Sequence, residues 1–266
     1  MIESQSNVQI KYLQKLIKNP RFRRKEKCFV VEGWKMVGEA LRHHLVSKLY
    51  ISADSAGQLR EKVTEDEFAV IESGVPTELL SENLFREMSD TVSPQGILAL
   101  VRMPEYQRSD FMKSGQAAVL CLENIQDPGN LGTMLRTAEG AGMSGIIMSS
   151  DCVDLFNPKV VRSTMGALFR VPYYICEDMT TEVERLKKED YSVYAAHLKG
   201  TKDYTEENYS GRVAVLIGNE ANGLSDSVAG RADKKVIIPM EGELESLNAA
   251  VSAALLMYEI HRKKHA

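Results

Sequence analysis

Short apolar runs alternate with helix-like stretches through the second half of this chain, and this alternation restricts the fold more than any other feature. The runs lie near residues 117–123, 145–149, 193–197, 213–218 and 235–239, and a final helix-like stretch covers 247–264. Strands that are apolar on both faces and alternate with helices are typical of a parallel sheet covered on both sides. This half of the chain therefore predicts an α/β fold.

Three polar clusters follow apolar runs of this half, and we call them motifs 1, 2 and 3. Motif 1 is Asn-Ile-Gln-Asp-Pro-Gly-Asn-Leu-Gly-Thr-Met-Leu-Arg at 124–136, and motif 2 is Ile-Gly-Asn-Glu-Ala-Asn-Gly-Leu-Ser at 217–225. Motif 3 is Ile-Ile-Pro-Met-Glu-Gly-Glu-Leu-Glu-Ser-Leu-Asn at 237–248. In open α/β sheets, ligands bind beyond the carboxyl ends of the strands. We therefore expect the motifs to lie in loops of one site.

The first hundred residues predict a smaller α/β domain. A helix with apolar residues at helical spacing covers 8–18 and stops at Asn19-Pro20. A second helix is expected at 34–43, and strands are expected at 28–33, 48–52, 67–71 and 96–101. A charged, proline-containing segment then interrupts the pattern. We predict a first domain at 1–101, a linker at 102–114 and a second domain at 115–266.

Positive charge is concentrated near the start of the chain, although the net charge of the whole is −4. Residues 1–48 contain 11 Lys and Arg and 4 Glu, a net charge of +7, which leaves −11 for residues 49–266. The densest cluster consists of Lys11, Lys15, Lys18, Arg21, Arg23, Arg24, Lys25 and Lys27. Such a cluster attracts phosphates and speeds association with nucleic acid, although a solvated helix face is the alternative.

Composition and missing motifs remove several functional classes. A length of 266 residues with 44% hydrophobic content fits one or two globular domains. The four cysteines form no Cys-x-x-Cys pair, the first segment has no signal-peptide pattern, and no apolar stretch is long enough to span a bilayer. We expect a soluble cytoplasmic protein. The five histidines indicate no metal site, and phosphate-loop, zinc-protease and nucleophile-elbow motifs do not occur in the sequence.

Gly140, Gly142 and Gly145 match the spacing of a dinucleotide-binding fingerprint, G-x-G-x-x-G. The fingerprint requires a strand before the glycines and a helix after them. Here a helix-like stretch precedes the glycines and an apolar run follows. We therefore expect these glycines to end a helix and turn the chain.

Taken together, motifs 1 to 3 resemble the three motifs of the SpoU (TrmH-type) branch of the SPOUT RNA methyltransferases, in the family's order. The resemblance covers roughly residues 117–262. It rests on an Asn and an Arg six residues apart after Asp-Pro-Gly, on Gly-Asn-Glu, and on Ile-Pro-Met with Ser-Leu-Asn. Residues 10–100 are less closely similar to the small RNA-binding domain that often precedes it, a relative of ribosomal-protein folds. That likeness rests on Phe-Val-Val-Glu-Gly at 29–33 and on the basic helix.

The resemblance implies an S-adenosylmethionine-dependent 2′-O-methyltransferase that acts on ribose in structured RNA. It also implies a trefoil knot in the C-terminal segment, which is a rare exception to normal chain topology. In the family, backbone groups of motifs 2 and 3 hold the adenosine. The matching residues of this chain are Leu216, Gly218, Asn219, Ile238, Met240 and Leu247.

The resemblance further assigns a catalytic set. Arg136 matches the family's catalytic arginine. Because a guanidinium is normally always protonated, we expect it to donate to the substrate phosphate and the 2′-oxygen, and the proton acceptor stays open. Asn130 and Asn248 match amides that orient cofactor and substrate, and Ser246 and Glu220 match polar partners of the same site.

Each of these residues also has a purely structural interpretation. Asn130 and Ser246 could cap helices, Arg136 could pair with Glu139, and Glu220 could be an ordinary loop carboxylate. All of them, however, occur together in one ordered set of motifs, and this favours the functional interpretation.

Two further expectations come from the resemblance. The segment at 162–172 is similar to one that lies between motifs 1 and 2 in the family, so Arg162 and Arg170 could contact RNA phosphate or could be surface arginines of a helix. The family's members are dimers whose active site takes residues from both subunits. The small, apolar residues at 249–257 suit either a core or a dimer interface, and we expect a homodimer.

The substrate is less constrained than the chemistry. Ribosomal RNA is favoured because a separate RNA-binding domain suits a large folded substrate, and a transfer RNA ribose methyltransferase is the alternative. A non-catalytic RNA-binding or assembly protein of the same fold predicts loss of motif residues, yet all five of the catalytic set are present. Methylation of a base nitrogen is a third possibility, which the Asn and Arg of motif 1 disfavour. The nucleotide, the RNA and the stage of ribosome maturation are not identified.

Overall fold

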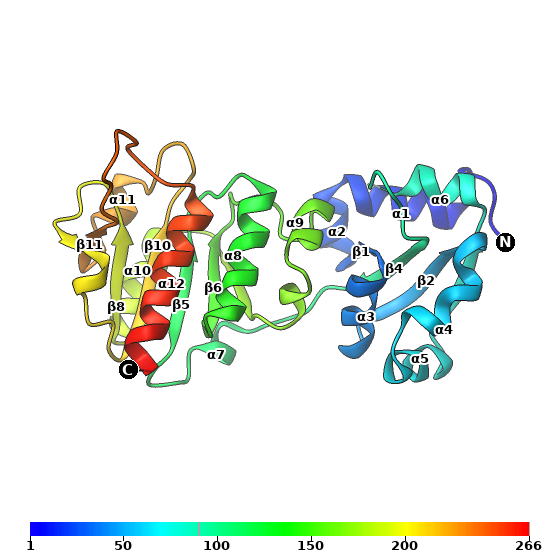
Figure 1. Ribbon diagram of the computed structural model, residues 1–266, viewed down its shortest axis with the longest axis horizontal. Coiled ribbons are helices and arrows are strands. Elements are labelled where there is room, and N and C mark those ends of the chain that lie inside the picture. The colour runs from blue at the N-terminus through cyan, green and yellow to red at the C-terminus, as the bar shows by residue number, and fades with distance from the viewer. Residues whose placement is uncertain (90, 266) are drawn as a thin grey trace. The chain divides into compact units, whose positions relative to one another are not determined.

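A computed structural model describes residues 1–89 and 91–265 (Figure 1). The chain divides into two compact units. The N-terminal unit consists of Met1–Glu105 together with Phe156–Phe169, and the C-terminal unit consists of Tyr106–Leu155 together with Arg170–Ala266. A segment of 14 residues from the second half of the sequence thus belongs to the unit formed by the first half.

The N-terminal unit has a four-stranded sheet with the strand order β1-β4-β2-β3. The strands are β1 (Cys28–Glu32), β2 (Val46–Ser52), β3 (Thr77–Leu80) and β4 (Ile97–Arg102). Strand β4 runs antiparallel to both β1 and β2, whereas β2 and β3 are parallel. The predicted strands at 28–33, 48–52 and 96–101 are therefore confirmed to within two residues.

Helices cover both faces of this sheet. Successive residues of a strand point to opposite faces, so neighbouring residues of β1 pack against different segments. Val30 packs in a buried cluster with residues of α1 (Val8–Lys18) and α6 (Glu82–Met88). Phe29 contacts Phe156 and Phe169, with ring centroids 4.8 and 6.2 Å apart, so the inserted segment packs beside β1. The remaining helices of this unit are α2 (Pro20–Glu26), α3 (Trp34–Arg42), α4 (Leu59–Lys62), α5 (Glu65–Glu72) and α9 (Pro158–Ser163).

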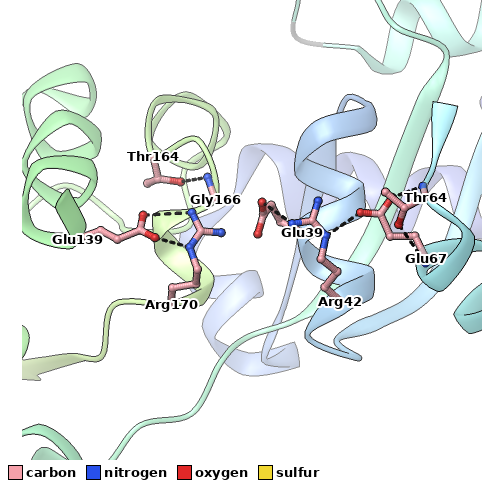
Figure 2. Close-up of polar contacts among 8 residues, drawn as sticks. All are labelled: Glu39, Arg42, Thr64, Glu67, Glu139, Thr164, Gly166 and Arg170. Atoms are coloured by element: carbon pink, nitrogen blue, oxygen red, sulfur yellow. Dashed lines mark hydrogen bonds and ion pairs between the residues drawn. The ribbon is translucent and has the colours of Figure 1, made fainter. Parts of the chain in front are cut away.

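The predicted strand at 67–71 is wrong, because this segment is the helix α5. The cause is a capping box: the N–H of Glu67 donates to the hydroxyl of Thr64 at 3.3 Å, and the N–H of Thr64 donates to the carboxylate of Glu67 at 2.9 Å. The same carboxylate is buried and accepts from Nε of Arg42 at 2.8 Å (Figure 2). The capping box therefore makes this segment a helix, although its apolar run is equally compatible with a strand.

The C-terminal unit has a seven-stranded, all-parallel sheet with the order β7-β6-β5-β10-β8-β11-β9. Its strands are β5 (Ala118–Leu122), β6 (Gly145–Ser149), β7 (Tyr173–Cys176), β8 (Tyr191–Ala196), β9 (Lys202–Asp203), β10 (Arg212–Ile217) and β11 (Lys234–Ile237). All five strands predicted for this half are present. The two edge strands β7 and β9 were not expected. The segment Lys202–Asp203 of β9 is polar and only two residues long, whereas the apolar run Tyr173–Cys176 of β7 was not recognised as a strand.

Helices cover both faces of the parallel sheet, as the apolar strands predicted. On one face α8 (Pro128–Gly140) and α12 (Ala249–His265) pack against each other (Figure 1). On the other face α7 (Arg108–Phe111), α10 (Met179–Lys188) and α11 (Asp226–Ala229) contribute to one buried cluster with strand residues. Gly140 ends α8, Gly142 turns the chain with φ +70°, and Gly145 begins β6, so the glycines lie between a helix and a strand as expected.

The order of the strands reverses between β5 and β10. The chain runs outward from β5 through β6 to β7, and then returns to form the other half of the sheet. The carboxyl ends of β5 and β10 are level, because Leu122 pairs with Ile217. Ligands of α/β proteins bind at such switch points. Motifs 1 and 2 begin at these two strand ends, as expected, and the trefoil knot stays a prediction.

Two features do not occur in the part of the chain that the structure describes. No helix there is long and apolar enough to cross a membrane. Among those same residues, no group of three or more His, Cys, Asp or Glu is arranged to hold a metal ion.

Candidate active site

A cavity of about 300 Å³ lies at the carboxyl ends of β8, β10 and β11 in the C-terminal unit. This volume is at the lower end of the range for small-molecule sites. Motifs 2 and 3 and the turn after β8 form its walls. The residues that line it are Ala196, His197, Leu198, Lys199, Ile217, Gly218, Asn219, Glu220, Ala221, Asn222, Gly223, Leu224, Val236, Ile237, Ile238, Met240, Glu245, Ser246, Leu247, Ala249 and Ser252.

Motif 2 forms a tight turn on one wall of this cavity. The N–H of Asn219 donates to the carbonyl of Gly223 at 3.0 Å, and the N–H of Gly223 donates to the carbonyl of Asn219 at 2.9 Å. A Cβ on Gly218 would lie 2.1 Å from the backbone of Gly223 and Leu224. Only glycine permits this close approach, which brings backbone groups to the cavity surface.

Five of the six expected cofactor residues line the cavity: Gly218, Asn219, Ile238, Met240 and Leu247. The sixth, Leu216, does not. It is fully buried in β10 and packs with Cys121 and Val193 in the core cluster on the α10 face. The pleat of the strand directs its side chain into the core, so the predicted contact of Leu216 with the cofactor would be made by its backbone and stays a prediction.

The amides of Asn130 and Asn248 form a hydrogen-bonded relay with Glu220. Nδ2 of Asn248 donates to Oδ1 of Asn130 at 2.9 Å, and Nδ2 of Asn130 donates to Oε1 of Glu220 at 3.0 Å. One residue of each motif thus contributes to the relay, although Asn130 and Asn248 are separated by 118 positions. The relay sets the orientation of both amides, because each has a defined donor and acceptor.

The carboxylate of Glu220 accepts several hydrogen bonds at the N-terminus of α8. Besides Asn130, it accepts from the backbone N–H groups of Gln126 and Asp127, both at 3.1 Å. Burial acts to raise the pKa of Glu220, but these hydrogen bonds hold the pKa below its usual value. The carboxylate is therefore ionised at neutral pH and ties motif 2 to motif 1.

Helices α8 and α12 are not capped by Asn130 and Ser246, the residues that the structural interpretation of the sequence suggested. The cap of α8 is Asp127, whose carboxylate accepts from the N–H of Asn130 at 2.8 Å. The cap of α12 is Asn248, whose Oδ1 accepts from the N–H groups of Ala250 and Val251 at 2.9 and 3.3 Å. Asn130 and Ser246 are not caps, and the exposed Ser246 lines the cavity.

Arg136 projects from α8 as an exposed side chain. Within residues 1–89 and 91–265 it makes no side-chain hydrogen bond or ion pair, and it does not line the cavity. The pairing with Glu139 that the sequence allowed is made instead by Arg170, whose Nη2 donates to Oε2 of Glu139 at 3.0 Å (Figure 2). The guanidinium of Arg136 is thus available to a ligand.

The basic cluster lies on α1 and α2 of the N-terminal unit, and most of it is exposed. On these two helices, the exposed members of the expected RNA-binding set are Lys11, Lys15, Lys18, Arg21, Arg24 and Lys25. Asn7 and Asn19 cap the two helices, and Ile10, Leu13 and Leu16 bury the opposite face of α1. The cations therefore share a solvent-facing surface, which is suited to a polyanion.

Arg23 was predicted to belong to this RNA-binding set, and the structure shows that it is buried. It is only 2% exposed, and its Nη1 donates to the carbonyls of Leu16 and Ile17 at 2.5 and 2.9 Å. Those carbonyls belong to the last turn of α1, where no intrahelical donor is available. Arg23 therefore joins α2 to α1, and it is not a surface cation.

Replacing Arg23 with alanine should lower the free energy of unfolding by about 2 kcal/mol, because two buried carbonyls lose a charged donor. The matched change Arg24→Ala, at an exposed neighbour on the same helix, should stay within about 0.5 kcal/mol of the parent. Urea unfolding of both variants measures the difference. Equal midpoints would show that Arg23 behaves as a surface residue.

Arg162 and Arg170 belong to different units. Arg162 lies on α9 in the inserted segment of the N-terminal unit, and it is half-buried. Arg170 is exposed in the C-terminal unit and pairs with Glu139, as described above. Whether either contacts RNA stays a prediction, and for Arg170 the existing ion pair must first open.

His197 is a cavity residue that the sequence interpretation did not include. It directly follows β8, and it lines the cavity together with Leu198 and Lys199. The available signal was its position at the carboxyl end of an apolar run, since strand ends of this kind carry ligand-binding residues.

Comparison with known proteins places these features in context. The model of the SpoU rRNA methylase family matches residues 117–258, and the model of an MRM3-like substrate-binding domain matches residues 7–99. The chain is 34% identical to the 23S rRNA (guanosine(2553)-2′-O)-methyltransferase RlmP of Bacillus subtilis over 97% of this chain and 98% of that protein.

Solved structures agree over nearly the whole chain. A crystal structure of an RNA 2′-O ribose methyltransferase is similar with a TM-score of 0.83 and 28% identity, covering 100% of this chain and 99% of the other. An AdoMet-bound rRNA methyltransferase from Sinorhizobium meliloti is similar with a TM-score of 0.80 and 27% identity, covering 98% and 97% of the two chains.

Proposed function

The chain belongs to the SpoU rRNA methylase family, and from this premise we propose that it transfers a methyl group from S-adenosylmethionine to the ribose 2′-oxygen of a nucleotide in ribosomal RNA. The relay of Glu220, Asn130 and Asn248 carries the proposal. It joins the three motifs at the rim of a cavity formed by motifs 2 and 3. A protein that only used the fold to bind RNA would have no need of this arrangement.

The cavity residues fit S-adenosylmethionine as the cofactor. Gly218 allows backbone N–H and C=O groups to reach an adenine edge, and Ile238, Met240 and Leu247 offer apolar surface for a ring. We assign the cofactor to Gly218, Asn219, Ile238, Met240 and Leu247. Leu216 would contribute backbone groups only, because its side chain is buried in the core.

When bound, the cofactor supplies an electrophilic methyl group. The task of the protein is then to hold the ribose hydroxyl in line and to stabilise the negative charge that develops on its oxygen. Arg136 is suited to the second task, because its guanidinium is exposed and has no partner among the described residues. Asn130, Asn248 and Ser246 orient the ligands, and Glu220 holds motif 1 in place by accepting three hydrogen bonds.

The test is methyl transfer from labelled S-adenosylmethionine to unmodified 23S rRNA, followed by nuclease digestion and mass spectrometry of the nucleosides. We expect a labelled 2′-O-methylnucleoside. The name of the Bacillus subtilis relative makes guanosine 2553 the first position to examine. A label on a base would contradict methylation of the ribose oxygen. A label found only in transfer RNA would contradict ribosomal RNA as the substrate. Tight RNA binding without any label would support a non-catalytic assembly protein.

RNA recognition is assigned to the N-terminal unit, which matches the MRM3-like substrate-binding domain. Its exposed cations on α1 and α2 offer contacts to phosphates. Changing Lys11, Lys18 and Lys25 together to alanine should weaken RNA binding and reduce the slope of log K against log salt by about 2 to 3, since each lost phosphate contact removes roughly 0.7 to 0.9.

The matched control changes three exposed lysines elsewhere, Lys62, Lys113 and Lys188, to alanine. This variant has the same net charge as the first one. Filter binding of ribosomal RNA over a range of salt concentrations measures both. An equal loss of slope in the two variants would assign the effect to net charge and would remove α1 and α2 as the binding surface.

We also propose a homodimer formed through α12. An open groove of about 880 Å³ lies along α12 and α8, and its apolar lining includes Val251 and Tyr258, which are 48% and 51% exposed. Thr133, one helical turn before Arg136 on α8, also lines it, so a second copy seated there would approach the catalytic arginine. Sedimentation equilibrium measures the mass, and a monomer at assay concentrations would contradict this proposal. We also propose a cytoplasmic location, because the relatives named above are bacterial and bacteria make ribosomal RNA in the cytoplasm.

A further inference from the structure

The turn after β8 holds His197 at the cavity in a defined position. The N–H of His197 donates to the carbonyl of Val236 at 3.0 Å, and the N–H of Gly200 donates to the carbonyl of His197 at 2.8 Å. A Cβ on Gly200 would lie 2.5 Å from the carbonyl carbon of Val236, so the turn lies directly against β11. The backbone that carries the imidazole is therefore fixed from both sides.

One hydrogen bond identifies the proton-bearing nitrogen of this ring. The backbone N–H of Lys199 donates to Nδ1 of His197 at 3.0 Å. Because an N–H group can donate only to an unprotonated nitrogen, the neutral ring carries its proton on Nε2. No group in the described part of the chain accepts from that Nε2–H, so this donor is free for a ligand.

The surroundings of the ring oppose a positive charge on it. The charged groups nearest to it and along the cavity wall are Lys199, Lys235, Asp226, Glu220 and Glu245. Burial lowers the pKa of His197 below its ordinary value of 6.5, and repulsion by Lys235 and Lys199 lowers it further, against a smaller opposing effect of Asp226. Of the two carboxylates that line the cavity, that of Glu220 accepts hydrogen bonds from the backbone just before α8, and that of Glu245 is exposed to solvent.

We infer that His197 is a cofactor-binding residue that acts as a neutral hydrogen-bond donor through Nε2, and that its protonation excludes S-adenosylmethionine more strongly than S-adenosylhomocysteine. This inference rests on the proposed function, since it takes the cavity to be the cofactor site. A second proton would have to enter at Nδ1, where it would meet the N–H of Lys199. Protonation would thus break the bond that orients the ring and also add a charge to the cavity.

The two ligands differ in charge. S-Adenosylmethionine has a sulfonium, an ammonium and a carboxylate group, a net charge of +1, whereas S-adenosylhomocysteine lacks the sulfonium and is neutral overall. An imidazolium therefore repels the methyl donor but has little net effect on the product. The lowered pKa keeps the ring neutral at pH 7, where the ratio of the dissociation constants, methyl donor over product, should be lowest. As the pH falls further and the ring takes up a proton, that ratio should rise.

Isothermal titration calorimetry of the protein with each ligand, from about pH 7 to about pH 5.5, tests this inference, since the α-amino groups of both ligands stay protonated in this range. In the parent protein we expect that ratio to increase as the ring takes up its proton, by up to roughly three- to tenfold for a fully charged ring, as one added charge in a partly solvated site predicts. In the variant His197→Asn the ratio should stay flat, because Oδ1 of asparagine can still accept from Lys199 but the amide does not titrate. His197→Gln provides a second non-titrating variant.

The matched control is His44→Asn, which removes a histidine from the N-terminal unit at a position with φ +54° that asparagine tolerates. It should keep the pH dependence of the parent. Parallel curves for the two ligands in the parent protein would overturn the inference, as would an unchanged acid shift in both His197 variants. If neither ligand binds the parent protein at any pH, the assignment of the cavity to the cofactor fails instead.

Discussion

Replacing Arg136 with alanine is expected to lower the rate of methyl transfer by about 10²- to 10³-fold, the usual effect of removing one donor to a developing oxyanion. Its side chain is exposed on α8, has no partner within residues 1–89 and 91–265, and does not line the cavity. The affinity for S-adenosylmethionine should therefore stay within roughly twofold of the parent. Single-turnover rates and calorimetric affinities measure the two effects separately.

Two variants serve as controls for this experiment. Arg136→Lys keeps the charge but loses the planar fork of donors, so it should recover only part of the rate. Arg185→Ala removes another exposed arginine of the same unit and should leave the rate unchanged. An equal loss of cofactor binding in Arg136→Ala would contradict the assigned role, because it would place this residue at the cavity and not at the substrate oxygen.

Replacing Gly218 with alanine should have the second large effect, this time on cofactor binding. The added methyl group would lie 2.1 Å from the backbone of Gly223 and Leu224. These backbone atoms cannot move away without breaking the paired hydrogen bonds between Asn219 and Gly223. We expect at least about a hundredfold weaker binding, equivalent to roughly 3 kcal/mol, and a loss of stability of about 1–3 kcal/mol.

Gly115→Ala is the matched control for Gly218→Ala. Gly115 belongs to the same unit, and a Cβ placed there meets no atom within 4 Å. Calorimetry with S-adenosylmethionine and thermal unfolding should find this control unchanged. If Gly218→Ala kept full affinity while losing stability, the turn of motif 2 would be a structural element only, and the cofactor site would have to be sought elsewhere.

Local patterns were sufficient where one signal dominated. The five strands predicted for the C-terminal unit were correct, because a parallel strand buried on both faces must be a continuous apolar run. The helix at 8–18 was also correct, since Asn7 caps it and its apolar residues have helical spacing. Where two local signals competed, the sequence misled: the apolar run at 67–71 hid the capping box that starts α5.

Side-chain roles were less accessible to sequence reasoning. Arg23 and Arg24 are neighbours in one basic run, yet one is buried against the end of α1 and the other is exposed. Leu216 is next to motif 2 but faces the core. Burial depends on which face of an element meets its neighbours, and a pattern of charges does not contain that information.

By itself, the sequence determined the α/β class, the parallel sheet, the strand-end position of the three motifs and the family, because each depends on short-range apolar spacing or on residues adjacent in the chain. Only the tertiary structure decided that Phe156–Phe169 joins the N-terminal unit, that Asn248, Asn130 and Glu220 form one relay, and that His197 borders the cavity. The physical reason is that these features require contacts between residues far apart in the chain, and such contacts form only when the sheet and its covering helices pack together.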